Sequence, residues 1–587
     1  MQCDYAKVAH LKQGQGYLTD GPLSEESVIS SNPSRNDRTR QIGVAKPSPQ
    51  RRSLNVGIYG FNTRTPPLYG IMSLSVLQGW VGAEVMIPSL NDTRALRLLL
   101  VDLHLSDYSL LPLFLARNII VRRTNSVKVV VVGWSLTGPT FCGKGNCTST
   151  CDEKSECDPG WGSQWSTSEK CPLNVCCSAY GFCGTTPDFC QGNVPTSPSC
   201  SGSSSDKRTI GYYEGWNLER DCQTMTPEKI PLGYYTHINF AFVLIDPDTF
   251  TISAMGEDVA ALYTRVTALK SLQPGLKVWI SVGGWAMNDP GPSRKTFSDL
   301  AASDDAQESF FHSLVTFMKA NNFDGVDIDW EYPVADDRGG KAADKENFVT
   351  FLKNLRHALD QSGMPERPGL SITIPSSYWY MRGFDIVKID PIIDFFNIMT
   401  YDIHGTWDSS DNSIGAIAQA HTNLTEIDLA MQLLWRNHID PERVVLGLGF
   451  YGRSFTMKSS SCLSAGCPFK EGGKAGPCTK TKGILSATEI RQVVADGAKV
   501  TLDSAAAVKI ITWDDDQWVS YDDGETMKTK IQYANSHCLG GTMAWAIDLD
   551  DGTTIEELGA DLDRPKFPTF DPDLFDPNSD NNTDLGT

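Results

Sequence analysis

The chain has 587 residues, 40% of them hydrophobic and 10% aromatic, a composition that excludes collagen-like, coiled-coil and wholly disordered proteins. This length excludes a single small module and suggests several domains, one of which could be a large barrel. Acidic residues number 71 against 51 lysines and arginines, and the formal net charge is −20. Such a balance argues against nucleic acid or an anionic membrane as the main partner, whereas a neutral polymer would not be repelled.

The cysteines are unevenly spread along the chain. Ten of the 16 lie between Cys142 and Cys200, and five follow in the remainder. This density is typical of a disulfide scaffold made in an oxidising compartment, so we expect a secreted, extracellular or cell-wall protein. The first residues show no readable signal peptide. The apolar stretch from Leu96 to Val121 is interrupted by several charges, so no membrane-spanning helix is predicted.

Composition also divides the chain into segments. Residues 1–140 are heterogeneous, with a first part that we expect to be disordered and no assignable function. A cysteine-rich module is expected over 141–200, followed by a flexible linker over 201–206, SGSSSD. A large domain is predicted over 207–560, and a disordered acidic tail over 561–587.

The large domain alternates short β-rich runs with segments of helical period. Helical spacing of apolar residues covers 257–272, 306–321 and 343–362. Eight strands that alternate with helices predict an α/β protein with a parallel (β/α)₈ TIM barrel. The interval between the seventh and eighth runs is the longest, and we predict a small α+β insertion there, at about 454–520. The eight runs are 208–214, 236–242, 277–283, 324–332, 370–375, 394–401, 444–450 and 540–547.

The fourth run, DGVDIDWEY, carries the sharpest chemical signal. Side chains alternate along a strand, so Asp327, Asp329 and Glu331 share one face and apolar residues share the other. An acidic, solvated edge is the simpler reading, but the intervening Val, Ile and Trp argue against it. Crowded carboxyl groups inside a barrel have perturbed pKa values, which is typical of catalytic sites. Glu331 ends the run, at the face of the barrel where active sites lie.

A carboxyl group held beside other carboxylates keeps its proton near neutral pH and serves as a general acid. Glycosidases commonly place two carboxylates on opposite sides of the bond that breaks. All the acids of this run would lie on one side of that bond. The pattern therefore suggests that the nucleophile belongs to the substrate, namely the 2-acetamido group of an N-acetyl sugar.

In these motifs the chain resembles glycoside hydrolase family 18, the chitinases. The fourth run matches the D-x-x-D-x-D-x-E signature of that family, and no catalytic position departs from it. The resemblance covers about 208–551. Four further matches are the S-x-G-G motif at Ser281–Gly284, M-x-Y-D at Met399–Asp402, Y-G-R at Tyr451–Arg453 and the eighth-strand Trp545.

The resemblance implies a role for each matching residue. Glu331 would protonate the glycosidic oxygen and then activate water. Asp329 would orient the acetamido N–H, with Asp327 sharing its proton, and Tyr401 would bind the acetamido oxygen. Tyr213 and Ser281 would support Asp327 from below. The sugar sites would be lined by Met399, Asp402 and Arg453, floored by Trp545 and extended on the leaving-group side by Trp285.

Two weaker patterns indicate no cofactor or metal site. Gly447-x-Gly449-x-x-Gly452 formally matches a dinucleotide fingerprint but is not followed by the start of a helix. His404 is a lone histidine, more typical of a hydrogen-bonded wall than of a metal ligand. We expect no cofactor and no metal.

The cysteine-rich module contains a second strong motif, which runs from Cys171 to Cys190. Zinc binding is the main rival interpretation, but the vicinal Cys176-Cys177 and the lack of a repeated C-x-x-C argue against it. So small a fold needs disulfides and leaves aromatic rings exposed for stacking. The string resembles the hevein-like (type 1) chitin-binding domain. That resemblance implies a sugar-contacting set of Ser178, Tyr180, Phe182 and Phe189, and the pairs Cys157–Cys177, Cys171–Cys183 and Cys176–Cys190.

A hevein-like module followed by a family 18 barrel resembles the fungal chitinases related to killer-toxin α-subunits. It implies a secreted monomer that hydrolyses the β-1,4 links of chitin, with endo action, and that the module tethers to the polymer. Its partners would be chitin and chito-oligosaccharides, with no nucleic acid and no membrane insertion. Two alternatives stay open: a non-catalytic chitin-binding protein, and a toxin-delivery subunit that uses chitin as a receptor.

Overall fold

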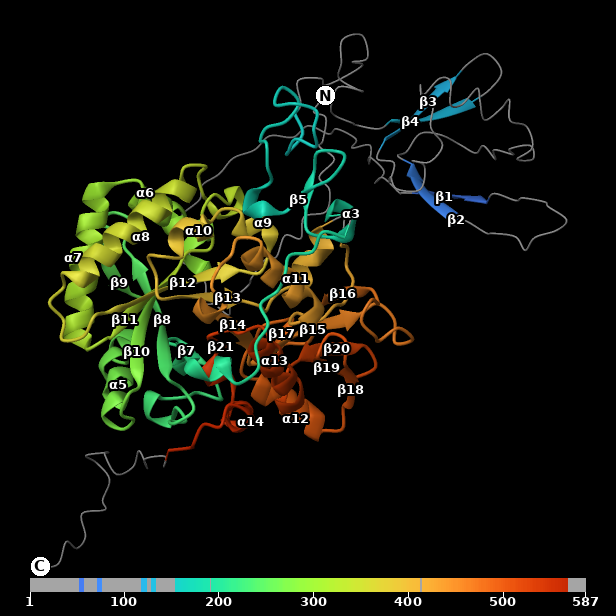
Figure 1. Ribbon diagram of the computed structural model, residues 1–587. Helices are drawn as coiled ribbons and strands as arrows, with labels where there is room; N and C mark the ends of the chain where they lie inside the picture. The colour runs from blue at the N-terminus through green and yellow to red at the C-terminus, as the bar shows by residue number, and fades with distance from the viewer. Residues whose placement is uncertain are drawn as a thin grey trace, which may run out of the picture. The chain divides into compact units, whose positions relative to one another are not determined.

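A computed structural model describes residues 154–190, 192–411 and 414–567 of the chain (Figure 1). It also gives the backbone of four strands, β1 (Arg52–Gly57), β2 (Ile71–Val76), β3 (Asn118–Arg123) and β4 (Lys128–Gly133). These form two antiparallel pairs, β1 with β2 and β3 with β4. The other predictions for residues 1–140, and those for the tail beyond residue 567, lie outside the described residues.

Eight parallel strands close into a barrel, as the sequence predicts. Each strand pairs with the next in chain order, β21 pairs with β7, and the ring is complete. The apolar residues of the barrel strands lie in a continuous buried core. The strands are β7 (Thr209–Glu214), β8 (His237–Ile245), β10 (Lys277–Gly283), β11 (Gly325–Asp329), β12 (Gly369–Pro375), β13 (Phe395–Met399), β14 (Val444–Gly449) and β21 (Gly541–Trp545).

Helices surround this ring (Figure 1). Side chains that accept a backbone N–H fix where two of them begin. Ser303 caps α7 (Asp304–Asn321) and Asn423 caps α11 (Leu424–Trp435), and each satisfies a donor that a helix end leaves free. The short strand β9 (Ile252–Ala254) continues the barrel sheet by pairing antiparallel with β8. The helices are α4 (Glu257–Ala260), α5 (Tyr263–Ala268), α6 (Thr296–Ala301), α7 (Asp304–Asn321), α8 (Asp344–Asp360), α9 (Tyr378–Met381), α10 (Ile386–Ile389), α11 (Leu424–Trp435), α13 (Gly524–Ser536) and α14 (Thr553–Asp561).

A second sheet is inserted between β14 and β21. It runs from Tyr451 to Tyr521, slightly wider than the predicted 454–520, and has a core of its own around Phe455 and Trp518. A capping box at Ser486 and Glu489 starts its helix, α12 (Ala487–Ala495). The strands are β15 (Tyr451–Met457), β16 (Phe469–Gly472), β17 (Ile484–Ser486), β18 (Lys499–Asp503), β19 (Val508–Trp513) and β20 (Gln517–Tyr521).

The cysteine-rich module has little regular structure: β5 (Cys176–Cys177), β6 (Cys183–Gly184) and the short α3 (Pro187–Cys190). It contains the three disulfide pairs that the resemblance implies, Cys157–Cys177, Cys171–Cys183 and Cys176–Cys190. Three further disulfides, which the sequence left unpaired, lie in or reach the barrel domain: Cys200–Cys538, Cys222–Cys478 and Cys462–Cys467.

Two segments that are predicted to be flexible make contacts with the barrel. The expected linker at 201–206 leads into a 3₁₀ turn, Ser204–Lys207, where Ser205 is fully buried and donates to the side chain of Asn535 at 2.8 Å. In the part of the tail that the structure describes, Arg564 donates to the Thr209 hydroxyl at 2.7 Å and Phe567 packs against the core. Small polar residues permit flexibility, but a disulfide and buried hydrogen bonds hold these segments on the barrel. Among the described residues, none of the helices is long and apolar enough to span a membrane.

Candidate active site

The carboxylate run lies inside the barrel. Val326, Ile328 and Trp330 face outwards, and the Trp330 ring stacks on Phe297 with 5.3 Å between centroids. Alternation then turns the acidic side chains inwards, where Asp327, Asp329 and Glu331 are 0%, 1% and 0% exposed. Strand β11 ends at Asp329, so Glu331 lies just past its carboxyl end.

The neighbouring S-x-G-G motif explains how two strand ends come so close. The backbone N–H of Gly284 donates to the carbonyl oxygen of Asp329 at 2.9 Å. A Cβ atom on Gly283 would lie 2.3 Å from that same oxygen, and its φ is +116°. Glycine is therefore required at this position by both space and backbone conformation.

Asp327 is the most heavily hydrogen-bonded of the three acids. Its Oδ2 accepts from the hydroxyls of Tyr212 and Ser281, both at 2.8 Å. Its Oδ1 accepts from the Ser371 hydroxyl at 2.6 Å and the Asn397 amide at 3.1 Å. Burial raises the pKa of Asp327, and these four donors oppose the rise because they stabilise the anion.

The structure corrects one predicted support of Asp327. Tyr213 points away from the barrel interior, and its hydroxyl donates to the backbone carbonyl of Met225 at 2.7 Å. Its neighbour Tyr212 takes the place that we assigned to Tyr213. A shift of one residue along a strand moves a side chain to the opposite face, so the motif located the strand correctly but not its inward side.

Asp329 and Glu331 retain protons more readily than free carboxyl groups. Burial, then the nearby charge of Asp327, raises the pKa of Asp329 to about 8, although the Thr373 hydroxyl donates to it. Burial, then the charge of Asp329, raises the pKa of Glu331 well above its usual range, and the positive charge of Arg338 opposes the rise. Neither carboxyl oxygen of Glu331 makes a hydrogen bond of regular geometry within the described part of the chain. The site therefore holds a buried acid with hydrogen-bonding capacity to spare.

Another acid at the mouth of the barrel, Asp402, has a lowered pKa in place of a raised one. Asp402 follows β13, and its Oδ1 accepts from the Tyr451 hydroxyl at 2.7 Å and from Nε of Arg453 at 2.6 Å. Burial alone would raise its pKa, but the Arg453 charge and the His421 ring lower it to about 2. Asp402 is therefore a fixed anion, engaged by a guanidinium, and is not a proton donor near neutral pH.

The other predicted sugar-site residues also gather at this end. Tyr401 and Met399 are each 1% exposed. The Trp545 ring lies 5.5 Å from that of Tyr212 and 5.7 Å from that of Phe242, centroid to centroid. Trp285 is half-buried, and the Arg338 guanidinium lies 3.5 Å above its ring. Two aromatic surfaces thus flank the acids, one at the end of β21 and one after β10.

In the module, the predicted sugar-contacting residues divide into two kinds. Tyr180, Phe182 and Phe189 are half-buried. Ser178 is 6% exposed, and its oxygen accepts the backbone N–H of Phe182 at 3.2 Å. Ser178 therefore shapes the loop that carries the rings. All six cysteines expected to form this scaffold are in disulfides, so they offer no thiolate of the kind that a zinc site uses.

His404 is a hydrogen-bonded wall residue, as expected. Its ring lies between Asp408, at 2.9 Å from Nδ1, and Glu426, at 3.0 Å from Nε2. Burial would lower its pKa, but the two carboxylates raise it to about 9, so the ring is positively charged near neutral pH. A protonated imidazole cannot ligate a metal.

Sequence reasoning missed several residues that shape the site. Tyr212, Ser371 and Asn397 hold Asp327, and Thr373 holds Asp329. A signal was present, because polar residues stand at alternate positions of otherwise apolar strands. Serine and threonine alternate with isoleucine in LSITIP, and Asn397 precedes Met399 by two positions in DFFNIMTY.

Comparison with protein families agrees with this geometry. The model described as "Glycosyl hydrolases family 18" matches residues 208–550, more than half of the chain. The model described as "Chitin recognition protein" matches residues 161–200.

Individual proteins that are similar to this chain include a chitinase, a killer toxin and a pseudo-chitinase. The chain is 32% identical over 417 residues to "Secreted chitinase LysM12" of Penicillium expansum, covering 65% of this chain and 27% of that protein. It is 36% identical over 341 residues to "Killer toxin subunits alpha/beta" of Kluyveromyces lactis, covering 55% and 28%. It thus spans about a quarter of the length of these relatives. Human YKL-39, a pseudo-chitinase with retained chitooligosaccharide binding, is 26% identical with a TM-score of 0.54, covering 61% of this chain and 98% of its own. The chain belongs to glycosyl hydrolase family 18 and carries a chitin-recognition module ahead of its barrel.

Proposed function

We propose that the protein hydrolyses the β-1,4 links of chitin by endo action, with the acetamido group of the substrate as nucleophile. One observation carries the proposal: a protonatable Glu331 lies beside Asp329 at the mouth of the barrel, both of them buried. Asp402, the carboxylate of the facing wall, is bound to Arg453 and Tyr451. It is therefore a poor nucleophile, which favours a nucleophile from the substrate.

The reaction then has two steps. Glu331 gives its proton to the glycosidic oxygen as the bond from that oxygen to C1 breaks, and the acetamido carbonyl oxygen bonds to C1 to form an oxazolinium ion. Asp329 passes its proton to Asp327, accepts the acetamido N–H as a carboxylate and balances the positive charge. In the second step the Glu331 carboxylate takes a proton from water, whose oxygen attacks C1 and reopens the ring. Two inversions at C1 leave the product in the β configuration.

The remaining residues position the substrate. Tyr401 donates to the acetamido oxygen, Trp545 lies under the reacting sugar, and Trp285 offers a stacking surface to the leaving group. Met399, Asp402 and Arg453 line the sugar sites, while Ser281 and Tyr212 hold Asp327. The module keeps the enzyme on the polymer, and its disulfides together with the secreted relative support an extracellular location.

Substitution of the acid tests the proposal. Glu331→Gln removes the proton donor without changing side-chain volume, and activity on chitin oligomers should fall by roughly 10²-fold or more. Binding of the same oligomers, measured by calorimetry, should persist. Glu366→Gln is the matched control, because Glu366 is 77% exposed and makes a surface ion pair. An activity of Glu331→Gln within a few-fold of the parent contradicts the role of Glu331, and a parent that binds oligomers without cleaving them favours the non-catalytic alternative.

The stereochemistry tests the nucleophile separately. NMR of fresh product should show the β-anomer, and fully deacetylated polymer should be inert because it lacks the acetamido group. Initial α-product, or ready cleavage of the deacetylated polymer, would mean that water or a protein carboxylate attacks C1 directly. A third candidate, toxin delivery with chitin as receptor, would show uptake of a cargo chain that persists when hydrolysis is abolished.

A further inference from the structure

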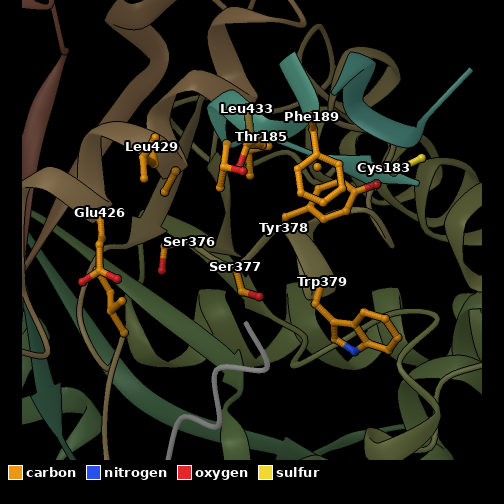
Figure 2. Close-up of a pocket in the computed structure, with 14 residues that line it drawn as sticks. Cys183, Thr185, Phe189, Ser376, Ser377, Tyr378, Trp379, Glu426, Leu429 and Leu433 are labelled. Atoms are coloured by element: carbon orange, nitrogen blue, oxygen red, sulfur yellow. The ribbon is translucent and has the colours of Figure 1, made fainter. Parts of the chain in front are cut away.

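A pocket lies between the cysteine-rich module and the barrel (Figure 2). The module contributes Phe189 and Thr185 to its wall, and the barrel contributes Tyr378 and Trp379, which follow β12, and Glu426 of α11. Figure 2 shows the rings of Phe189 and Tyr378 pointing into the same space from the two sides. Of the three predicted sugar-contacting rings of the module, Phe189 lines this pocket and Tyr180 and Phe182 do not, so Phe189 is turned towards the barrel.

Several contacts hold the module in this position. The side-chain amide of Asn437 donates to the backbone carbonyl of Leu173 at 2.8 Å, and the amide of Asn174 donates to the Asn437 side-chain oxygen at 3.0 Å. Arg436 donates to the backbone carbonyl of Asn193 at 3.3 Å. The Cys200–Cys538 disulfide then fixes the chain that leaves the module to the barrel. The pocket is therefore a built part of the fold.

The Phe189 ring is backed on one side by the protein. A Cβ atom at Gly184 would lie 2.5 Å from Cγ of Phe189, so the ring rests directly on the backbone of Gly184. Because Phe189 also lines the pocket, it presents the rest of its surface to an occupant. A flat ring held in this way is a stacking platform, since its orientation is fixed before anything binds.

The chemistry of the pocket suits a neutral sugar. Aromatic rings of the module and of the barrel line it together with the Thr185 and Ser377 hydroxyls, and Glu426 is the one charged residue among those that line it. Glu426 accepts from His404 and from the Asn423 amide, and a carboxylate with about four acceptor sites keeps room for a hydroxyl or an acetamido N–H. An anionic ligand would meet a like charge here. The volume of about 130 Å³ is well below the roughly 300 Å³ of pockets that enclose a drug-sized ligand, so the pocket has room for a single small unit of a longer chain and not for an oligomer.

The pocket lies at the same end of the barrel as the acids. Ser376 and Ser377 directly follow Pro375, the last residue of the strand whose Thr373 donates to Asp329. Ile403, another lining residue, is two positions past Tyr401. We propose that this pocket is a sugar subsite shared by the module and the barrel, which takes one N-acetylglucosamine unit of the chain that also occupies the catalytic cleft. The proposal rests on the proposed function, and it makes the module an extension of the cleft.

Affinity for oligomers of different length tests the shared subsite. In the full-length Glu331→Gln protein, which cannot hydrolyse its ligand, calorimetry compares chitin trimer with hexamer. Phe189→Ala and Tyr378→Ala should each weaken hexamer binding about threefold to tenfold, the range expected for one aromatic contact. Trimer affinity should change less than twofold. The double variant should lose less than the product of the single losses, because both rings contact the same sugar.

Controls make the outcome decisive. Val387→Ala changes an exposed side chain outside the pocket and should leave both affinities unaltered. Thr185→Arg fills the pocket without removing either ring, and should also weaken hexamer binding, which guards against a misfolded Phe189 variant. Hexamer affinity unchanged in Tyr378→Ala and Thr185→Arg overturns the shared subsite. If the parent background binds neither oligomer, the proposed function itself fails, so the two failures are distinguishable.

Discussion

The barrel and the cysteine-rich module keep their shape in different ways. The barrel buries charged and polar groups within a large apolar shell, as at Asp327 with its four donors and at Lys530, which is 1% exposed and paired with Asp522. The described part of the module, from residue 154 on, has few buried apolar residues and contains three disulfides of its own. Acid catalysis needs carboxyl groups shielded from water, whereas sugar stacking needs rings that keep part of their surface accessible, as the half-buried rings of the module do. The comparison therefore predicts global effects from changes to buried charges in the barrel, and local effects from changes to the disulfides of the module.

The largest effect is expected at the buried ion pair of α13. Lys530→Met leaves Asp522 as an uncompensated buried anion and should reduce the free energy of unfolding of the barrel by about 3–5 kcal/mol. Denaturant unfolding measures it. Lys277→Met, which removes a surface pair with the 77% exposed Glu366, is the control and should cost about 1 kcal/mol or less. Equal losses in the two variants would break the contrast between buried and exposed charge.

The module should respond locally to loss of a disulfide. Replacing Cys176 and Cys190 with Ser opens a loop with a sequence separation of 14 and should destabilise the module by about 3 kcal/mol. Adsorption to insoluble chitin should fall, and protease should cut within 157–190 first. The thermal transition of the barrel should stay near that of the parent. A barrel transition that falls in parallel would show that the module contributes to barrel stability through its docked face.

A pH effect should arise at His404. Its folded pKa of about 9 lies above the usual 6.5, so its stabilising contribution is fully present below pH 6.5 and is lost as the pH rises through 9. The melting temperature of the parent should therefore fall between pH 7 and 10 more steeply than that of His404→Asn. Parallel pH profiles for the two proteins would mean that His404 is neutral when folded.

The smallest effect separates two adjacent tyrosines. Tyr212→Phe removes a donor to the buried Asp327 and should lower kcat by roughly tenfold to 10²-fold, since hydrogen bonds to charged groups contribute about 1.5–3 kcal/mol. Tyr213→Phe loses a bond to the Met225 carbonyl and should cost about 1 kcal/mol of stability with kcat near that of the parent. Steady-state kinetics and thermal unfolding of both variants measure the difference. A larger loss of kcat in Tyr213→Phe would restore the assignment made from the motif alone.

The sequence by itself determined the barrel, its eight strands and the strand that carries the acids. These follow from local patterns, because alternation places Asp327, Asp329 and Glu331 on one face and spacing separates strands from helices. It also marked the three disulfide pairs of the module through a resemblance in cysteine spacing. Both kinds of signal are contained within a short stretch of chain.

What the tertiary structure decided depends on residues far apart in the chain. The donors to Asp327 come from strands β7, β10, β12 and β13, and barrel closure alone brings them to one carboxylate. The choice between Tyr212 and Tyr213 depended on which side of β7 faces inwards, and both residues are tyrosine, so composition gave no guide. The docking of the module on α11, with the Cys200–Cys538 bond across a separation of 338 residues, has no local pattern at all. Contacts of this range arise from packing, which depends on the three-dimensional position of each surface rather than on the spacing of residues along the chain.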